Sequence, residues 1–408
     1  MAHEATRSRK GAQAGAREVF LVALRLGLTS FGGPTAHLAA FQREYVGRRR
    51  WLSDGTFAGL VAMSQVLPGP SSSQVGIGIG LLRAGYAGAL GAWLGFTLPS
   101  AALMIGLAVL TGSLDLAGAG WVHGLELAAA AIVGSALIAL WRSLAPDAPR
   151  SLIALAAALV LVAVGGAATQ LVVIGGAAAA GWLALRWIAP EPGAESLRQP
   201  VSRRVAALAL AAFAALLVGL PVLAAATSSE SVAAVDAFYR AGSLVFGGAH
   251  VVLPLLDELV VAPGWVTDEQ FVAGYGAAQA MPGPLFTFGA YLGALATPLA
   301  GGLAGGVVAI VAIFLPSFLL VIGAFPSWGR LRSSPGFRGA LAGVNAAVVG
   351  LILAALYDPI LTSAVATPLD AALIVTAFVA LRLRNVPPWL VVAALAAAAQ
   401  ILRAASLV

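Results

Sequence analysis

The strongest constraint on the fold is an internal repeat, because the second half of the chain matches the first at a spacing of 214 to 217 residues. Phe31-Gly32-Gly33 recurs as Phe246-Gly247-Gly248, and Pro68-Gly69-Pro70 recurs as Pro282-Gly283-Pro284. A series of matches in one order, with little drift, indicates a duplicated structural unit. The further matches are Arg25 with Arg240, Gln65 with Gln279, "WLSDGTF" (51–57) with "WVTDEQF" (265–271), and "LPS" at 98–100 with "LPS" at 315–317.

The repeated unit is too apolar for a protein that folds in water. Hydrophobic residues make up 60% of the 408 residues and charged residues 10%, whereas a soluble domain has roughly 25% charged residues. We therefore expect an all-α, polytopic transmembrane protein of the cell inner membrane, with about nine full spans and additional broken or re-entrant helices. The long apolar stretches are 86–111, 121–141, 151–167 and 169–187 in the first half, and 300–324, 337–357, 367–381 and 387–405 in the second.

Charges in the loops predict that the two repeats have inverted topology. The loop at 43–54 contains four arginines and two acids, whereas its counterpart at 257–269 contains four acids and no basic residue. Basic loops favour the cytoplasmic side, so the same loop is expected on opposite faces of the membrane. One unmatched apolar run, 205–226, provides the additional crossing. These loop arginines also account for the net charge of +6, and we expect no nucleic-acid partner.

This organisation divides the chain into four parts. We expect a basic cytoplasmic tail at 1–18, because it lacks the cleavage site of a signal peptide. The first transporter repeat follows at 19–187. A linker with one inverting transmembrane helix occupies 188–232, and the second transporter repeat occupies 233–408. The chain has no cysteine, so disulfides and thiolate chemistry are excluded.

The glycine and proline motifs predict helix breaks at membrane depth. Backbone N–H groups freed by a break cannot face lipid, so they must line a cavity or bind a ligand. In transporters built from inverted repeats, such half-helix ends form the substrate site between the repeats. Helix N-termini carry partial positive charge. The motifs therefore predict a site for a small anion.

Arginine, amide and hydroxyl side chains near the breaks are the candidate ligands. Arg25 and Arg240 each lie six residues before a Phe-Gly-Gly motif, and guanidinium groups match oxyanions in a bidentate way. The alternative is that both snorkel to the interface. The nearby amides and hydroxyls either donate to the anion or satisfy carbonyls freed by proline. We predict no catalytic, metal or cofactor site, and these substrate-binding residues: Arg25, Arg240, Gly32, Gly33, Gln65, Gly69, Ser71, Ser72, Gly247, Gly248, Gln279 and Gly283.

Other polar residues receive structural interpretations. His37 and His250 lie at different offsets from the two Phe-Gly-Gly motifs, so we assign them hydrogen-bonding roles. Glu126, three residues after His123, either carries a coupling proton or lies near the outer interface. The alternative function from a different class is an intramembrane hydrolase that uses a serine and a histidine. The chain lacks the nucleophile-elbow and H-E-x-x-H spacings, so we expect no enzyme activity.

Together these motifs resemble the chromate ion transporter family in its long, two-domain form. The matching pieces include "SFGGPTAHLAAF" (30–41), "QVLPGPSSSQ" (65–74), "FGGAH" (246–250) and "AMPGP" (280–284). The second half departs from the pattern, because Ala249 replaces the proline of Phe-Gly-Gly-Pro and the serine run after Pro-Gly-Pro is missing. This departure suggests unequal roles for the two halves.

The resemblance implies export of chromate from the cytoplasm, driven by the membrane potential or by protons. We therefore expect a multi-pass transporter that exports this tetrahedral oxyanion by alternating access and confers chromate resistance. The alternative is an importer or exchanger of sulfate or another anion on the same scaffold. The expected partners are a small inorganic oxyanion, either chromate or sulfate, and the lipid bilayer, and a homodimer is left open.

Overall fold

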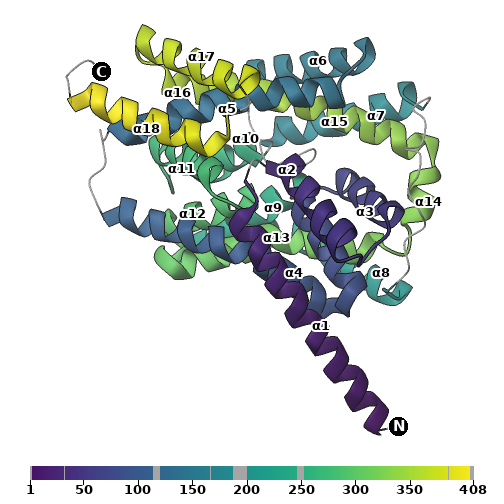
Figure 1. The fold of residues 1–408 in the computed structure, drawn as a ribbon. Helices are drawn as coiled ribbons and strands as arrows, with labels where there is room; N and C mark the ends of the chain where they lie inside the picture. Colours follow the sequence, from purple (N-terminus) through teal and green to yellow (C-terminus); the bar gives the residue numbers. More distant parts are fainter. Residues whose placement is uncertain are drawn as a thin grey trace.

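The computed structural model describes residues 2–31, 33–113, 120–165, 167–186, 200–245, 252–384 and 386–404, and Figure 1 shows the fold. The regular elements of these ranges are all helical, which confirms the expected all-α class. The first half contains α1 (Ala2–Thr29), α2 (Gly33–Phe41), the π-helical η1 (Gln42–Arg48), α3 (Asp54–Val66), α4 (Ser71–Ser113), α5 (Gly120–Leu144), α6 (Ala148–Val164) and α7 (Ala167–Ala184).

The helix α8 (Arg203–Thr227) lies between the halves in sequence. The second half begins with α9 (Glu230–Leu244), α10 (Val252–Leu256), η3 (Asp257–Val261), α11 (Asp268–Ala280), η4 (Leu285–Thr287), α12 (Phe288–Leu295) and η5 (Thr297–Leu299). It continues with α13 (Gly302–Ala324), α14 (Trp328–Ser333), α15 (Pro335–Ala355), η6 (Leu356–Leu361), α16 (Thr362–Ala364), α17 (Pro368–Leu383) and α18 (Pro388–Ala404).

The helices break where the glycine and proline motifs lie. α1 ends at Thr29 and α2 begins at Gly33, while the two Pro-Gly-Pro motifs separate α3 from α4 and α11 from η4. The helices that lead into these motifs also start alike. Ser53 caps α3 by accepting the N–H of Thr56, and Thr267, the equivalent residue, caps α11 through the N–H of Gln270. This shared capping explains why "WLSD" and "WVTD" recur.

α4 consists of two antiparallel arms. Ala84 and Gly85 leave the helical conformation, and Gly85 has a φ of +64°. A Cβ at Gly80 would lie 2.2 Å from the carbonyl oxygen of Gly88, so the arms touch backbone to backbone on either side of the turn. The turn brings the Ser71 end of α4 beside residues about seven to nine positions beyond Gly88.

Among the described residues, five helices are long and apolar enough to cross a bilayer, namely α4, α5, α8, α13 and α15. The sequence suggested about nine full spans. The difference arises from four shorter helices. α6, α17 and α18 have 16 or 17 residues, and such a helix is about 26 Å long against about 30 Å of hydrocarbon. The apolar part of α7 is limited to Val172–Ala184. The chain remains a polytopic membrane protein with short and broken helices between its spans.

The helices form two bundles, and each bundle contains helices of both halves (Figure 1). The motif bundle comprises α1, α4, α8, α9, α12 and α13, and the scaffold bundle comprises α5, α6, α7, α15, α17 and α18. In the scaffold bundle the halves exchange partners, because α5 packs on α17 and α18 while α15 packs on α6 and α7. The two halves therefore fold as one interlocked body.

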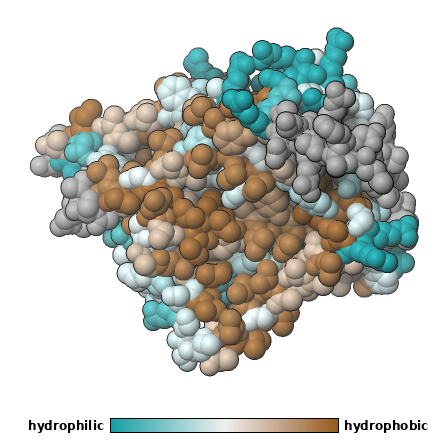
Figure 2. Space-filling model, turned by 90° about the horizontal axis from the view of Figure 1, so that it is seen from below, coloured by the Kyte–Doolittle hydropathy of each residue, from teal (hydrophilic) through white to brown (hydrophobic). Residues whose placement is uncertain are grey.

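The outer surface suits a lipid environment. Figure 2 shows a face dominated by hydrophobic residues, with hydrophilic residues gathered toward its rim. Leu208 and Val218 of α8 and Leu303 of α13 are among the large apolar side chains that are exposed. Such extensive apolar exposure is expected where lipid covers the protein. The four sequence divisions stay a prediction, and α1 runs unbroken through the boundary proposed at residue 18.

Candidate functional site

Each Pro-Gly-Pro motif contacts the Phe-Gly-Gly break of the other half. The N–H of Gly69 donates to the carbonyl oxygen of Val245 at 2.6 Å, and the N–H of Gly283 donates to the carbonyl oxygen of Ser30 at 2.9 Å. Val245 and Ser30 each directly precede a Phe-Gly-Gly motif. The structure thus brings each Pro-Gly-Pro motif to the residue that precedes the Phe-Gly-Gly motif of the other half, as expected for contacts between two repeats.

The two glycines also lie against the matched Leu-Pro-Ser motifs. Gly69 has a φ of +112° and Gly283 a φ of +96°, a conformation that side chains with a Cβ rarely adopt. A Cβ at Gly69 would lie 2.7 Å from the Oγ of Ser317, and one at Gly283 would lie 2.8 Å from the Oγ of Ser100. Both serines are fully buried. Glycine is therefore needed in each Pro-Gly-Pro motif for two reasons: the backbone has a positive φ, and a Cβ would collide with the buried serine.

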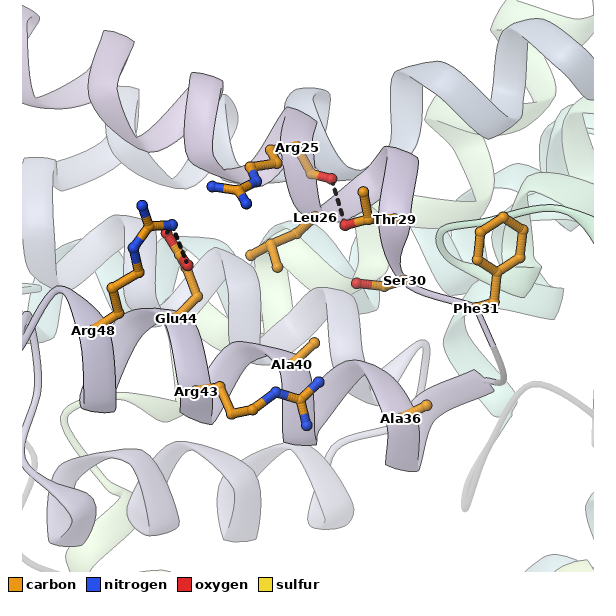
Figure 3. Close-up of a pocket in the computed structure, with 10 residues that line it drawn as sticks. All are labelled: Arg25, Leu26, Thr29, Ser30, Phe31, Ala36, Ala40, Arg43, Glu44 and Arg48. Carbon is orange, nitrogen blue, oxygen red and sulfur yellow. Dashed lines mark hydrogen bonds and ion pairs between the residues drawn. The ribbon is translucent and has the colours of Figure 1, made fainter. Parts of the chain in front are cut away.

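A pocket of about 330 Å³ opens beside the first break (Figure 3). We call it the vestibule. Figure 3 shows Arg25 on α1 and, across the space, Arg43, Glu44 and Arg48 on η1. Three arginines against one glutamate give the vestibule a net charge of +2 (3 − 1). Its lining residues are Arg25, Leu26, Thr29, Ser30, Phe31, Ala36, Ala40, Arg43, Glu44 and Arg48.

The vestibule forms because α2 and η1 fold back along α1. Arg49, which directly follows η1, pairs with Glu18 of α1 at 3.1 Å and with Glu44 of η1 at 2.8 Å. The guanidinium of Arg49 also lies over the ring of Trp51 at 5.4 Å. These contacts are partly exposed, so each contributes little alone, but together they hold η1 against α1.

The charges in the vestibule are unequally compensated. Burial opposes ionisation of Glu44, but hydrogen bonds from Arg49 and Arg48 outweigh it and lower the pKa of this carboxyl. Arg25 and Arg43 form no ion pair with any residue that the structure describes. Both guanidinium groups are exposed. They are free to bind an anion.

Arg240 has a different environment from Arg25. Its guanidinium forms an ion pair with Asp236, four residues earlier on α9, and the Asp236 side chain is almost fully buried. Removing one partner of a buried pair leaves an uncompensated charge, which is strongly destabilising. The structure therefore places the two matched arginines in unlike settings, one free and one paired.

Hydroxyl groups gather at the N-terminus of α4. Ser71, Ser72 and Ser73 are buried there, and the first hydrogen bond along the helix runs from the N–H of Gln74 to the carbonyl oxygen of Pro70. The N–H groups of the three serines therefore have no partner within the helix. Such a helix end is suited to an anion.

The equivalent helix start in the second half has hydrogen-bond donors already occupied by the protein. There the N–H of Thr287 donates to the carbonyl oxygen of Pro284 at 3.0 Å, and the Thr287 hydroxyl donates to the same oxygen at 2.8 Å. Phe286 and Phe288 stand where the first half has Ser72 and Gln74. This asymmetry agrees with the unequal roles that the missing serine run suggested.

The remaining predicted ligands lie near these motifs. Gln65 is half-buried, and the Nε2 of Gln279 is buried without a hydrogen-bond partner among the described residues. Gly33 has a φ of +79°, and no atom lies within 4 Å of where its Cβ would be. Gly32, Gly247 and Gly248 lie outside the described residues. The assignment of these residues as anion ligands stays a prediction.

Sequence reasoning missed Arg43 as a site residue. It was used only as an indicator of topology. The signal was the break at Phe-Gly-Gly-Pro, because a chain that reverses there must bring the following helix back beside Arg25. Recognising that reversal would have placed Arg43 in the lining of the same pocket as Arg25.

A second polar cluster joins the scaffold helices. His123 of α5 contacts Asp370 of α17 at 2.8 Å and Glu126 at 3.4 Å. Asp370 is fully buried and also accepts the N–H groups of Ala366 and Thr367. Glu126 is thus held by His123 at the start of α5, and its role as a proton carrier stays a prediction.

Comparison with known proteins gives a consistent result. A sequence model described as chromate transporter matches residues 17–182 and again residues 232–401. The chromate transport protein of Pseudomonas aeruginosa is 30% identical over 84% of this chain and 80% of its own length. The chromate transport protein of Cupriavidus metallidurans is 28% identical over 92% of this chain and 90% of its own length. No solved structure matches the chain.

Proposed function

Because the chain belongs to the chromate transporter family, we propose that it transports chromate and exports it from the cytoplasm by alternating access. The observation that carries this proposal is the vestibule. It combines uncompensated guanidinium groups with a helix break and lies on the loop whose arginines predict the cytoplasmic side. Chromate is proposed as the substrate because two relatives of this chain are named chromate transport protein.

The vestibule is the first site at which the ion binds. Arg25 and Arg43 attract a dianion electrostatically, and their planar guanidinium groups can each contact two oxygens of a tetrahedral oxyanion. Both side chains are exposed to water in this state, so binding there leaves the ion partly hydrated. The vestibule thus selects for negative charge more than for size.

The membrane potential provides a driving force. A cell interior that is negative repels the ion outward by about 2.3 kcal/mol per charge per 100 mV, or about 4.6 kcal/mol for a dianion. Export therefore needs no obligatory proton, and it lowers cytoplasmic chromate. Chromate resistance of the cell follows from that outward movement. The inner membrane of the cell is the proposed location.

Alternating access requires a second, outward-facing arrangement. The crossed hydrogen bonds at Gly69 and Gly283 link each break to the other half, so a movement of one half displaces both breaks. Arg240 is the matched arginine of the second half, and we propose that it exchanges Asp236 for the ion in the outward-facing state. The pair with Asp236 neutralises Arg240 while the site faces the cytoplasm.

Transport by inside-out vesicles tests the proposal. With a potential that is positive inside the vesicle, chromate is expected to accumulate in vesicles that contain the protein and not in empty ones. The Arg25→Gln variant should insert normally but accumulate about tenfold less chromate. Sulfate uptake into intact cells, with no movement of chromate in the vesicles, would contradict export and favour the sulfate importer.

A further inference from the structure

Four buried polar atoms near the first break have no hydrogen-bond partner among the described residues. They are the Oγ of Ser30, the Nε2 of His37, the Oγ of Ser73 and the Oγ1 of Thr97. Each of these side chains is at most 5% exposed. Buried polar groups are almost always hydrogen-bonded, so a group of orphans in one region indicates that something other than protein satisfies them.

His37 links the helix break to both arms of α4. The Nδ1 of His37 lies 3.3 Å from the Oγ of Ser72, and the rings of His37 and Phe96 meet edge to face with centroids 5.2 Å apart. His37 therefore contacts both antiparallel arms of α4, and Ser73 and Thr97 directly follow the two contacted residues, Ser72 and Phe96, in the sequence. His37 also approaches the backbone of Ser30, which begins the break.

The cluster offers hydrogen-bond donors. Three of the four side chains carry a hydroxyl, and the partnerless N–H groups of α4 point from the same helix end. If Ser72 donates its hydroxyl hydrogen to Nδ1 of His37, the proton of the neutral ring resides on Nε2, the unpartnered nitrogen. Donors fixed by a buried framework, with a helix N-terminus among them, match an oxyanion.

The cluster is continuous with the vestibule. Ser30 lines the vestibule and also supplies one of the orphan atoms, so it connects the two regions. The second half lacks this set of orphan hydroxyls at the matched positions, where Val245, Thr287 and Phe314 replace Ser30, Ser73 and Thr97. Thr287 closes its own helix end. The fold itself therefore does not require the orphan hydroxyls.

We propose that Ser30, His37, Ser73 and Thr97, with the first N–H groups of α4, form a second binding site for a tetrahedral dianion. The ion reaches this site from the vestibule after losing its water. The inference rests on the proposed function and adds to it a binding site for the dehydrated ion. This site is built from neutral donors and is confined to the first repeat. The vestibule attracts the charge, and the inner site recognises the oxygens.

The isosteric variant Thr97→Val tests the inner site, because it removes an orphan hydroxyl without changing the shape. We measure chromate binding to the purified full-length protein by calorimetry and chromate transport in vesicles. Loss of one hydrogen bond to a charged ligand should raise the dissociation constant and KM about tenfold. The melting temperature should stay the same or rise. Ser73→Ala should act alike.

The matched control is Thr376→Val on α17, whose hydroxyl already donates to the carbonyl oxygen of Ala372 at 2.7 Å and is exposed. It should bind and transport as the wild type does. The salt dependence of binding distinguishes the vestibule from the inner site. The effect of Arg25→Gln should shrink as salt rises, whereas that of Thr97→Val should persist because the inner site is buried.

Unchanged binding and transport in both Thr97→Val and Ser73→Ala would overturn the inner site, since the cluster would then hold water alone. Lost transport that merely follows a lower melting temperature would overturn it as well. A wild type that binds sulfate but not chromate would contradict the proposed substrate instead. The inner site would survive that result if Thr97→Val weakened sulfate binding.

Discussion

The N–H of Gly283 donates a hydrogen bond to the carbonyl oxygen of Ser30, and this bond ties the Pro-Gly-Pro motif of one half to the Phe-Gly-Gly break of the other. Gly69 and Val245 repeat the arrangement with the halves exchanged. Neither half can move its helix break without disturbing a loop of its partner. A transporter built in this way is expected to change state as a unit, because its crossed contacts must break and form together.

The two Pro-Gly-Pro glycines provide the first prediction. Gly69→Ala and Gly283→Ala should each reduce transport at least about tenfold and lower the melting temperature, because a Cβ there meets a buried serine at under 3 Å and the positive φ adds strain of about 1–2 kcal/mol. Chromate transport in vesicles and thermal unfolding in detergent measure the two effects.

Gly264→Ala is the control for strain alone. Gly264 has a φ of +79°, but no atom lies within 4 Å of where its Cβ would be. This variant should lose a little stability and keep transport. If all three variants behaved alike, backbone strain would explain the result and the crossed contacts would not be needed.

The ion pair of α9 provides the second prediction. Arg240→Gln alone should destabilise the protein by about 3–5 kcal/mol, because Asp236 would remain buried and charged without a partner. Arg240→Gln combined with Asp236→Asn should recover the melting temperature but still transport about tenfold less chromate than wild type. A double variant that transports normally would show that Arg240 has only a structural role.

The helix breaks and their caps could be predicted from the sequence, because both arise from local chemistry. Proline and glycine are the poorest helix formers, and two or more of them in succession favour a break. Ser53 and Thr267 stand where an N-terminal cap is favoured. The pair of Asp236 and Arg240 was also within reach, since residues four apart share a helix face. The partial burial of this pair could be learned only from the structure.

Other features depend on packing between distant segments. The exchange of partners by α5 and α15 was not predictable, because their apolar faces resemble each other and either could pack on several helices. The inner cluster was equally hidden. Its hydroxyls are distinguished by having no partner, and a sequence does not show which hydrogen bonds are missing.

The acidic side of the molecule provides a prediction on pH. Burial first, then the nearby Asp268, Asp358 and Glu258, raise the pKa of Asp257 to about 7. In the unfolded chain the same carboxyl releases its proton near pH 4. The folded state therefore holds an additional proton between about pH 4 and 7, and stability from this group declines as pH rises through that range.

Asp257→Asn should remove that decline. The variant should melt a few degrees above the wild type at pH 8 and show a smaller difference at pH 5, where the native carboxyl is protonated. Thermal unfolding across this pH range measures the effect. Glu230→Gln, at the exposed start of α9, is the control. An Asp257→Asn protein that melted below the wild type at pH 8 would mean that the ionised carboxylate has a stabilising partner.

The vestibule provides the last prediction, in which two adjacent substitutions act in opposite directions. Arg43→Gln removes an unpaired cation, so KM for chromate should rise about fivefold at low salt, as expected for one charge about 8 Å from a dianion in water. Glu44→Gln removes the opposing charge, so KM should fall by a similar factor. Both effects should shrink in high salt. Arg142→Gln, at the end of α5, is the control.

The Glu44 effect should hold across the neutral range and below it, because the arginines lower the pKa of this carboxyl and keep it ionised. Initial rates of chromate uptake in inside-out vesicles, measured from pH 5 to 8, check this. If Glu44→Gln instead raised KM, the carboxylate would act mainly by holding Arg48 and Arg49 in place. The vestibule would then bind the ion through the geometry of its arginines and not through its net charge.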